Sequence, residues 1–235
     1  MLLFYTPTID KKSSSFMLDE AESKHAIKVL RLTVGDKINL VDGKGTFFDA
    51  EITQAHAKKC ELKILSSIAE KITKPAIHIA IAPTKNNDRL EWFVEKATEI
   101  GITEITPLIC QRSERKTLKI DRLEKTAIAA MKQSLKATLP EINEPVSFKD
   151  FIKNTPPQNN QFIAHCLDNT EKHLIEICLK NESALILIGP EGDFTKEEID
   201  LAIKNRFKPI SLGKSRLRTE TAGIVACHTI NLINE

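Results

Sequence analysis

The sequence is short of glycine, it has no closely spaced cysteine pair, and it contains no long apolar run. Glycine supplies only eight of 235 residues, about half of the ~7% that is usual. Five cysteines without a C-x-x-C pair argue against a disulfide framework and a structural zinc site. The first ten residues lack a basic n-region and a long h-region, and no run reaches membrane-spanning length. We therefore expect a cytoplasmic protein with no signal peptide, membrane span or metal.

The remaining composition is that of an ordinary globular protein. Apolar residues make up 41% and charged residues 28% of the chain, which excludes collagen, low complexity and disorder. The formal net charge of +2 is too small to indicate a polyanionic partner by itself. Six bases and no acid lie between Lys204 and Arg218, a run that a solvated helix end and loop would also explain.

The first ~70 residues predict short strands and one helix. Strands are expected at 37–41, 46–53 and 60–64, with a hairpin signal at 42–45. An apolar stripe with helical spacing runs through residues 19–30. A small β-barrel is the natural closure for such strands, and we place this domain at residues 1–72.

Residues 73–235 alternate between strands and helices, which predicts an α/β domain with a parallel sheet covered on both faces. One expected helix begins at an Asp88 cap and ends at Gly101. A second ends before Pro140, and a third begins at the Thr195 capping box. A further helix contains residues 222–229. The expected strands are 77–82, 105–109, 162–165, 185–188 and 209–212.

Ligands of open parallel sheets collect at the carboxyl ends of the strands, and two glycine-containing loops follow expected strands there. Gly189 and Gly192 lie in the first loop and Gly213 in the second, where a missing Cβ lets the main chain approach a flat ring such as adenine. Neither loop is a P-loop or a G-x-G-x-x-G. Tight strand-to-helix turns without a ligand remain an alternative.

The strings LIGPEGDF and LGKSRLRTETA resemble the two signature loops of RsmE-type methyltransferases of the SPOUT class. HAIKVLR, RLEWFVEKATEIG, and MKQS ahead of PEI agree with this family, so the resemblance spans nearly the whole chain. It implies a PUA-like β-barrel followed by a SPOUT domain with a trefoil knot, and a homodimer. It also implies methylation of N3 of a uridine in 16S ribosomal RNA, with S-adenosylmethionine as the methyl donor.

The resemblance implies that the cofactor is held by the two loops and the residues that flank them. The expected cofactor-binding residues are Leu187, Ile188, Gly189, Pro190, Glu191, Gly192, Leu212, Gly213, Leu217, Arg218, Thr219 and Ala222. The chain departs from the family pattern at Leu3, Lys136, Asp193 and Arg216. These departures affect individual RNA contacts more than the cofactor loops.

Two residues are candidates for catalysis. Loss of the N3 proton leaves negative charge on the ring, and Arg218 is the candidate that would stabilise this charge. A structural pairing of Arg218 with Glu220 or a phosphate is the alternative. Glu191 could orient the cofactor or accept the proton, or be only an acid favoured by a nearby helix dipole.

N3 lies on the Watson–Crick edge, so the target uridine must be unpaired or extruded. Basic residues must then hold the phosphates of 16S ribosomal RNA, as naked RNA or in the assembled small subunit. The RNA-binding candidates are His25, Lys28, Arg31, Arg112, Arg115 and Lys136. For His25, packing or capping within the small domain is the favoured interpretation.

Two other functions stay open. Asp193, where the family has glycine, would suit a ribosome-associated RNA-binding protein with a degenerate cofactor site. Calorimetry with S-adenosylmethionine distinguishes this alternative from an enzyme, because a protein that only binds RNA should show no heat of cofactor binding. A nucleotide-binding enzyme for a small metabolite is disfavoured by the additional β-domain and the absence of phosphate-loop glycines.

Overall fold

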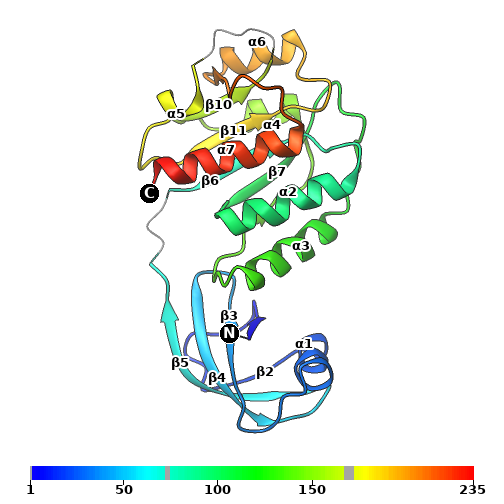
Figure 1. Cartoon of the computed structure of the whole chain (residues 1–235), viewed down its shortest axis with the longest axis vertical. Coiled ribbons are helices and arrows are strands. Elements are labelled where there is room, and N and C mark those ends of the chain that lie inside the picture. Colours follow the sequence, from blue (N-terminus) through cyan, green and yellow to red (C-terminus); the bar gives the residue numbers. More distant parts are fainter. Residues whose placement is uncertain (1, 72–74, 167–171) are drawn as a thin grey trace. The chain divides into compact units, whose positions relative to one another are not determined.

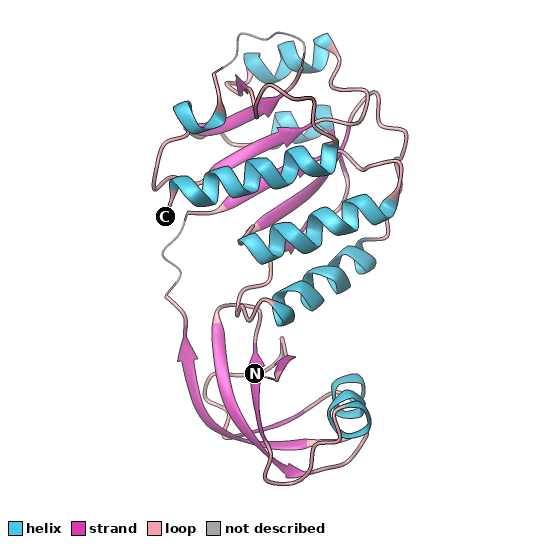
Figure 2. Ribbon diagram, viewed as in Figure 1, coloured by secondary structure: helices cyan, strands magenta, loops and turns pink. Residues whose placement is uncertain are grey.

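The computed structural model describes residues 2–71, 75–166 and 172–235, and the chain forms two compact units (Figure 2). The first unit contains residues 1–73 and 131–139, and the second contains 74–130 and 140–235. Our sequence-based division at residue 72 assigned 131–139 to the second domain. The structure differs because Met131 and Ala137 pack against Leu3 and Val41 in a common apolar cluster.

A single sheet forms the body of the first unit. Its strand order is β1-β3-β4-β5-β2, an open, barrel-like path in which β1 pairs with β3 in parallel and the other neighbours are antiparallel. Phe4, Leu40 and Phe48 lie in the core that this sheet covers. The strands are β1 (Leu3–Tyr5), β2 (Ser15–Met17), β3 (Lys37–Val41), β4 (Thr46–Gln54) and β5 (Glu61–Ala69).

The expected helix over residues 19–30 is two short helical segments. Asp19 caps α1 (Glu20–Lys24) by accepting a hydrogen bond from the Glu22 amide at 2.7 Å. The chain continues as a π-helix, η1 (His25–Val29), where the Leu30 amide donates to the carbonyl of His25 at 3.0 Å. Apolar spacing predicts a helical segment here but does not distinguish its hydrogen-bond pattern.

All strand pairs of the second unit are parallel, which confirms the predicted parallel sheet. The order is β12-β10-β11-β6-β7-β8, and β9 pairs separately with β7. The short strands β8 and β9 were not predicted from the sequence. The strands are β6 (Ile77–Ile81), β7 (Glu104–Ile109), β8 (Glu141–Ile142), β9 (Val146–Ser147), β10 (Asn160–Ala164), β11 (Ala184–Ile188) and β12 (Lys208–Ile210).

The helix ends follow local capping chemistry. The cap of α2 is Asn86 and not the expected Asp88, because the Asn86 side chain accepts from the Asp88 amide. Gly101 ends α2 at φ 119°, a left-handed conformation that favours glycine. The capping box of α6 is confirmed, since the hydrogen bonds between Thr195 and Glu198 form in both directions. The helices are α2 (Asn87–Ile100), α3 (Ile120–Gln133), α4 (Phe148–Asn154), α5 (Leu174–Ile177), α6 (Lys196–Lys204) and α7 (Thr219–Ile233).

Helices cover both faces of this sheet, as Figure 1 shows. Leu185 and Leu187 point to one face, where they join a buried cluster with residues of α4 and α6. On the other face, α7 packs beside α2, and Gly223 lies close to Phe93 and Ile81. Because successive side chains of a strand point to opposite faces, the fully buried strand β11 serves both layers.

None of the five cysteines forms a disulfide, and Cys166 is exposed while the other four are buried. No helix among the described residues is long and apolar enough to span a membrane. The threading of the C-terminal chain into a knot stays a prediction of the resemblance. The carboxyl ends of β10 and β11 open toward the loops that carry the glycines.

Candidate active site

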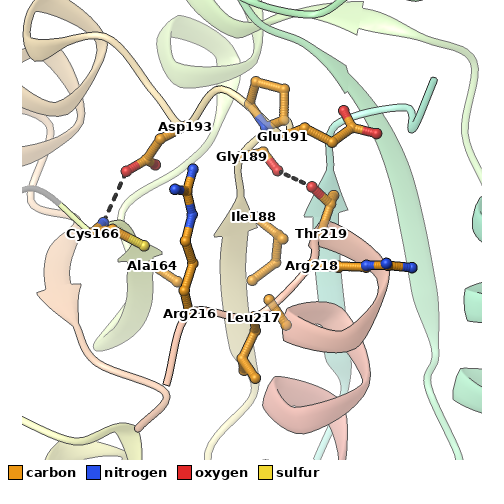
Figure 3. Close-up of a pocket in the computed structure, with 12 residues that line it drawn as sticks. Ala164, Cys166, Ile188, Gly189, Glu191, Asp193, Arg216, Leu217, Arg218 and Thr219 are labelled. Carbon is orange, nitrogen blue, oxygen red and sulfur yellow. Dashed lines mark hydrogen bonds between the residues drawn. The ribbon is translucent and has the colours of Figure 1, made fainter. Parts of the chain in front are cut away.

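A cavity of about 270 Å³ lies at the carboxyl ends of β10 and β11 and at the start of α7 (Figure 3). Three segments form it: the residues that follow β10, the loop from β11 to α6, and the loop from β12 to α7. Its lining residues are Ala164, Cys166, Ile188, Gly189, Pro190, Glu191, Asp193, Arg216, Leu217, Arg218, Thr219 and Ala222. The two loops singled out in the sequence therefore meet in one site.

Most of the expected cofactor-binding residues line this cavity. They are Ile188, Gly189, Pro190, Glu191, Leu217, Arg218, Thr219 and Ala222. Four others do not line it. Leu187 points into the core on the opposite face of β11, and Gly192 lies against the Arg112 side chain. Leu212 and Gly213 precede the part of their loop that reaches the cavity.

Four lining residues were not among the sequence candidates: Ala164, Cys166, Asp193 and Arg216. Ala164 is the last residue of β10 and Cys166 follows it, and β10 lies between β11 and β12 in the sheet. Strand order could not be read from the alternation of elements, so this wall of the cavity was not predicted. Asp193 and Arg216 belong to the two loops and were noted only as departures from the family pattern.

Hydrogen bonds tie the walls of the cavity together. The Thr219 hydroxyl donates to the carbonyl of Gly189 at 3.0 Å, which joins the start of α7 to the loop after β11. The Asp193 carboxylate accepts from the amide of Cys166 at 2.9 Å and from that of Phe194 at 2.8 Å. Figure 3 shows both interloop bonds. The relative positions of the three segments are thus set by polar contacts.

Arg112 and Arg115, expected to contact RNA, hold main-chain carbonyls of neighbouring loops. The Arg112 guanidinium donates to the carbonyls of Gly192 at 2.8 Å and Phe194 at 3.4 Å. Arg115 donates to the carbonyl of Lys85 at 3.0 Å through Nη2 and 3.3 Å through Nε. These bonds use donors of both side chains to fasten the loops after β6, β7 and β11.

Glu191 also has a role in loop structure. Its Oε1 accepts a hydrogen bond from the Lys85 amide at 3.0 Å, so the carboxylate links the loop after β11 to the loop after β6. A charged acceptor makes such a bond stronger than one between neutral groups. The geometry therefore supports orientation of the cavity wall by this residue.

The remaining RNA candidates lie in the first unit. Lys28 and Arg31 are exposed, and Lys136 is half-buried. The His25 ring lies edge-on to Phe4 with centroids 6.0 Å apart, which agrees with the packing interpretation. These positions place cations on the first unit without assigning them a ligand.

Two arginines of the last loop take opposite directions (Figure 3). Arg216 extends toward the side of Asp193, whereas Arg218 points away from it. Arg218 occupies the cap position of α7, and its side chain makes no capping bond there. Among the ion pairs of the described residues, none joins Arg218 to Glu220; Glu220 Oε1 lies 3.8 Å from Nε of Arg89 instead.

A second cavity, of about 570 Å³, adjoins the first. It shares Arg216, Leu217 and Arg218 with the first cavity, and its other residues come from the starts of α2 and α7. Trp92 of α2 is 44% exposed at this cavity. Two adjacent compartments separated by Leu217 and Arg218 are suited to two ligands that react with each other.

The described ranges contain no group of three or more His, Cys, Asp or Glu side chains placed to bind a metal ion. Burial raises the pKa of the Cys110 thiol, so this residue near the site is not a thiolate nucleophile at neutral pH. Hydrogen bonds from its own amide and from Thr195 lower the pKa of Glu197 at the start of α6. The side chains of the site can therefore position bound ligands and interact with the charges that these ligands carry.

Substitution of Asp193 tests the bond between the segments. Asp193 has φ 61°, which costs alanine but not glycine about 1 kcal/mol. Both substitutions remove the bonds to Cys166 and Phe194. We therefore expect Asp193→Ala to lower the free energy of unfolding by about 1 kcal/mol more than Asp193→Gly, measured by urea denaturation. Equal values would contradict the left-handed conformation of this residue.

Comparison with known proteins agrees with the site. Residues 71–231 match the family described as RNA methyltransferase domain, and residues 18–65 match the RNA methyltransferase PUA domain. The fold and the two loops thus define an RNA methyltransferase with an N-terminal PUA domain. A relative from Rickettsia conorii, ribosomal RNA small subunit methyltransferase E, is 32% identical over 226 residues, covering 94% of this chain and 91% of the relative. The chain belongs to the ribosomal RNA small subunit methyltransferase E family.

Solved structures give the same result. A crystal structure described as a probable rRNA-methyltransferase from Porphyromonas gingivalis is 42% identical, with a TM-score of 0.91 and 99% coverage of both chains. Ribosomal RNA small subunit methyltransferase E from Neisseria gonorrhoeae, solved bound to S-adenosyl methionine, is 27% identical with a TM-score of 0.89. That comparison covers 100% of this chain and 98% of the other.

Proposed function

We propose that this protein uses S-adenosylmethionine to methylate N3 of a uridine in 16S ribosomal RNA. The observation that carries the proposal is the cavity at the ends of β10 and β11, built from the two loops by which the chain resembles its family. A relative of the same fold was solved with S-adenosyl methionine bound. The proposed substrate is 16S ribosomal RNA, naked or in the assembled small subunit, and the proposed location is the cytoplasm.

The lining of the cavity fits the chemistry of this cofactor. Ile188, Leu217 and Ala222 offer apolar surface for a flat ring. Glu191 and Asp193 supply negative charge for a sulfonium and an ammonium group, while the nearby guanidinium groups supply positive charge for a carboxylate. When bound, the cofactor supplies a methyl group that is activated by its attachment to a sulfonium.

The side chains of the site position the reactants and stabilise charge. Arg218 lines both cavities, where its guanidinium stabilises the negative charge that the base acquires as N3 loses its proton. Thr219 and Glu191 hold the loops in place through their bonds to Gly189 and Lys85.

RNA binding is assigned in this proposal to the PUA-like domain over residues 1–72 together with Lys136 of the segment 131–139, which belongs to the same compact unit, and catalysis to the rest of residues 73–235. Lys28, Arg31 and Lys136 are the proposed phosphate contacts, since their side chains lie on the first unit and are at least partly accessible. A homodimer would allow the PUA-like domain of one copy to present RNA to the cavity of the other. Because Arg112 and Arg115 already donate hydrogen bonds to main-chain carbonyls, the proposal gives them a smaller part in RNA binding than the residues of the first unit.

Two measurements test the proposal. Calorimetry should detect binding of S-adenosylmethionine to the purified protein. Mass mapping of small-subunit RNA from a strain that lacks the gene should show the loss of one N3-methyluridine, which returns when the gene is restored. An unchanged pattern of modified nucleotides would contradict the assigned reaction. Absence of cofactor heat would favour an RNA-binding protein with a degenerate site.

A further inference from the structure

The second cavity has an aromatic wall. Trp92 is the sole tryptophan of the chain, and it is 44% exposed on α2 although it neighbours the fully buried Phe93. Leu217 and Arg218 form the boundary between this cavity and the proposed cofactor site. An exposed indole beside arginine side chains is a surface on which a nucleobase can stack, and such stacking contributes to the binding free energy of each base.

The same cavity contains an unusual carboxylate. The Glu220 side chain is only 8% exposed. Its Oε1 faces Arg89 at 3.8 Å, and its Oε2 is buried with no hydrogen-bond partner within the described residues. Buried polar atoms are nearly always hydrogen-bonded, and Glu220 lines the cavity, so its carboxylate is an acceptor available to a ligand that brings an N–H or O–H group.

The charges around this carboxylate suit a nucleotide. Arg89, Arg216 and Arg218 line the cavity and offer cations for phosphates. Asp88, the other acid of the cavity, is already 3.6 Å from Arg122. Glu220 is therefore the acid left to accept a hydrogen bond from the base.

We propose that the second cavity receives the target uridine, stacked on Trp92, and that Glu220 accepts its N3–H hydrogen bond and then its proton. This assignment rests on the proposed function. In the reaction the N3–H bond breaks and its proton passes to Glu220, while N3 forms a bond to the methyl carbon and the carbon–sulfur bond of the sulfonium donor breaks with its electron pair. The proton leaves Glu220 for water afterwards. Glu191, which is bonded to the Lys85 amide, holds the loop.

Trp92 reports on binding without any cofactor. Uridine 5′-monophosphate should quench the fluorescence of the wild-type protein in a saturable manner, after correction with N-acetyltryptophanamide at equal absorbance. Cytidine 5′-monophosphate should bind more weakly, because its N3 is an acceptor that faces the carboxylate. In Glu220→Gln we expect uridine affinity to fall about ten-fold and the preference over cytidine to disappear. Glu124→Gln, on the exposed surface of α3, is the matched control.

Single-turnover methylation of 16S RNA tests the proton transfer. Glu220→Gln should be slower than wild type by about 100-fold or more near neutral pH. Its rate should rise as pH increases, because solvent then removes the N3 proton, so its deficit relative to wild type shrinks. Glu191→Gln should keep the pH profile of the wild type. A Glu220→Gln deficit that is constant with pH would overturn the role in proton transfer.

Three outcomes would reject the proposal that the second cavity receives the target uridine. They are the absence of quenching by uridine 5′-monophosphate, equal quenching by both nucleotides in wild type and Glu220→Gln, and dissociation of a dimer by Trp92→Ala. The last would mean that a second copy covers Trp92. These outcomes differ from failure of the proposed function, which would appear in the wild-type protein as no S-adenosylmethionine heat and no N3-methyluridine.

Discussion

Replacement of Arg218 by alanine is expected to slow methyl transfer about 100- to 1000-fold, while S-adenosylmethionine still binds. The guanidinium lines both cavities, where it can interact with charge that appears only as the uridine loses its N3 proton. An interaction made mainly in the transition state affects turnover more than binding. Cofactor affinity from calorimetry and single-turnover methylation of 16S RNA are the two measurements.

Two variants make the Arg218 experiment specific. Lys214→Ala removes a positive charge from an exposed position in the same loop, outside both cavities, and should keep wild-type turnover. Arg218→Lys keeps the charge but loses the planar fork, so it should recover only part of the rate. Wild-type turnover of Arg218→Ala would remove this residue from the mechanism.

Substitution of Gly223 by alanine is expected to lower the free energy of unfolding by about 1–3 kcal/mol. A Cβ at this position would lie 2.6 Å from Cε2 of Phe93 and 3.0 Å from Cδ1 of Ile81. Phe93 and Ile81 are fully buried, so neither can move aside without disturbing the layer between α7, α2 and β6. Alanine normally stabilises a helix interior by about 1 kcal/mol relative to glycine, which makes a loss of stability diagnostic of the close approach.

His228→Ala is the control for Gly223→Ala, because His228 is an exposed residue of the same helix. We expect its free energy of unfolding to remain within about 0.5 kcal/mol of wild type. Urea denaturation with equal m-values would show that both variants compare the same folded and unfolded states. A stability gain in Gly223→Ala would contradict the packing of α7 on α2.

The elements of the chain were largely readable from local patterns. The β11 strand and the α6 capping box are encoded by adjacent residues, so both were predicted within a residue or two of their observed bounds. The two-residue strands β8 and β9 were not predicted, because two residues are too few to show a periodic pattern and both strands are defined by their pairing with β7. The segment 131–139 likewise joins the first unit through contacts that are distant in sequence.

In the candidate site, too, some residues could be predicted from the sequence and others could not. The glycine-containing loops carry their signal in consecutive letters, and the two come together around the first cavity. Cys166 and Trp92 belong to other segments, and no spacing rule relates them to those loops. Gly223 had no assigned role in the sequence, since its need for a missing Cβ arises from Phe93, 130 residues earlier in the chain.

The sequence by itself determined the class of most of the longer elements, the two loops that build the site, and membership of a methyltransferase family, because these depend on residues that are neighbours in the chain. Only the tertiary structure decided the strand order that places β10 between β11 and β12. It also decided that Arg112 and Arg115 donate hydrogen bonds to main-chain carbonyls of neighbouring loops, and that Trp92 and Glu220 line the same cavity. The physical reason is that burial and long-range hydrogen bonds are properties of pairs of segments, which the pattern of a single segment does not contain.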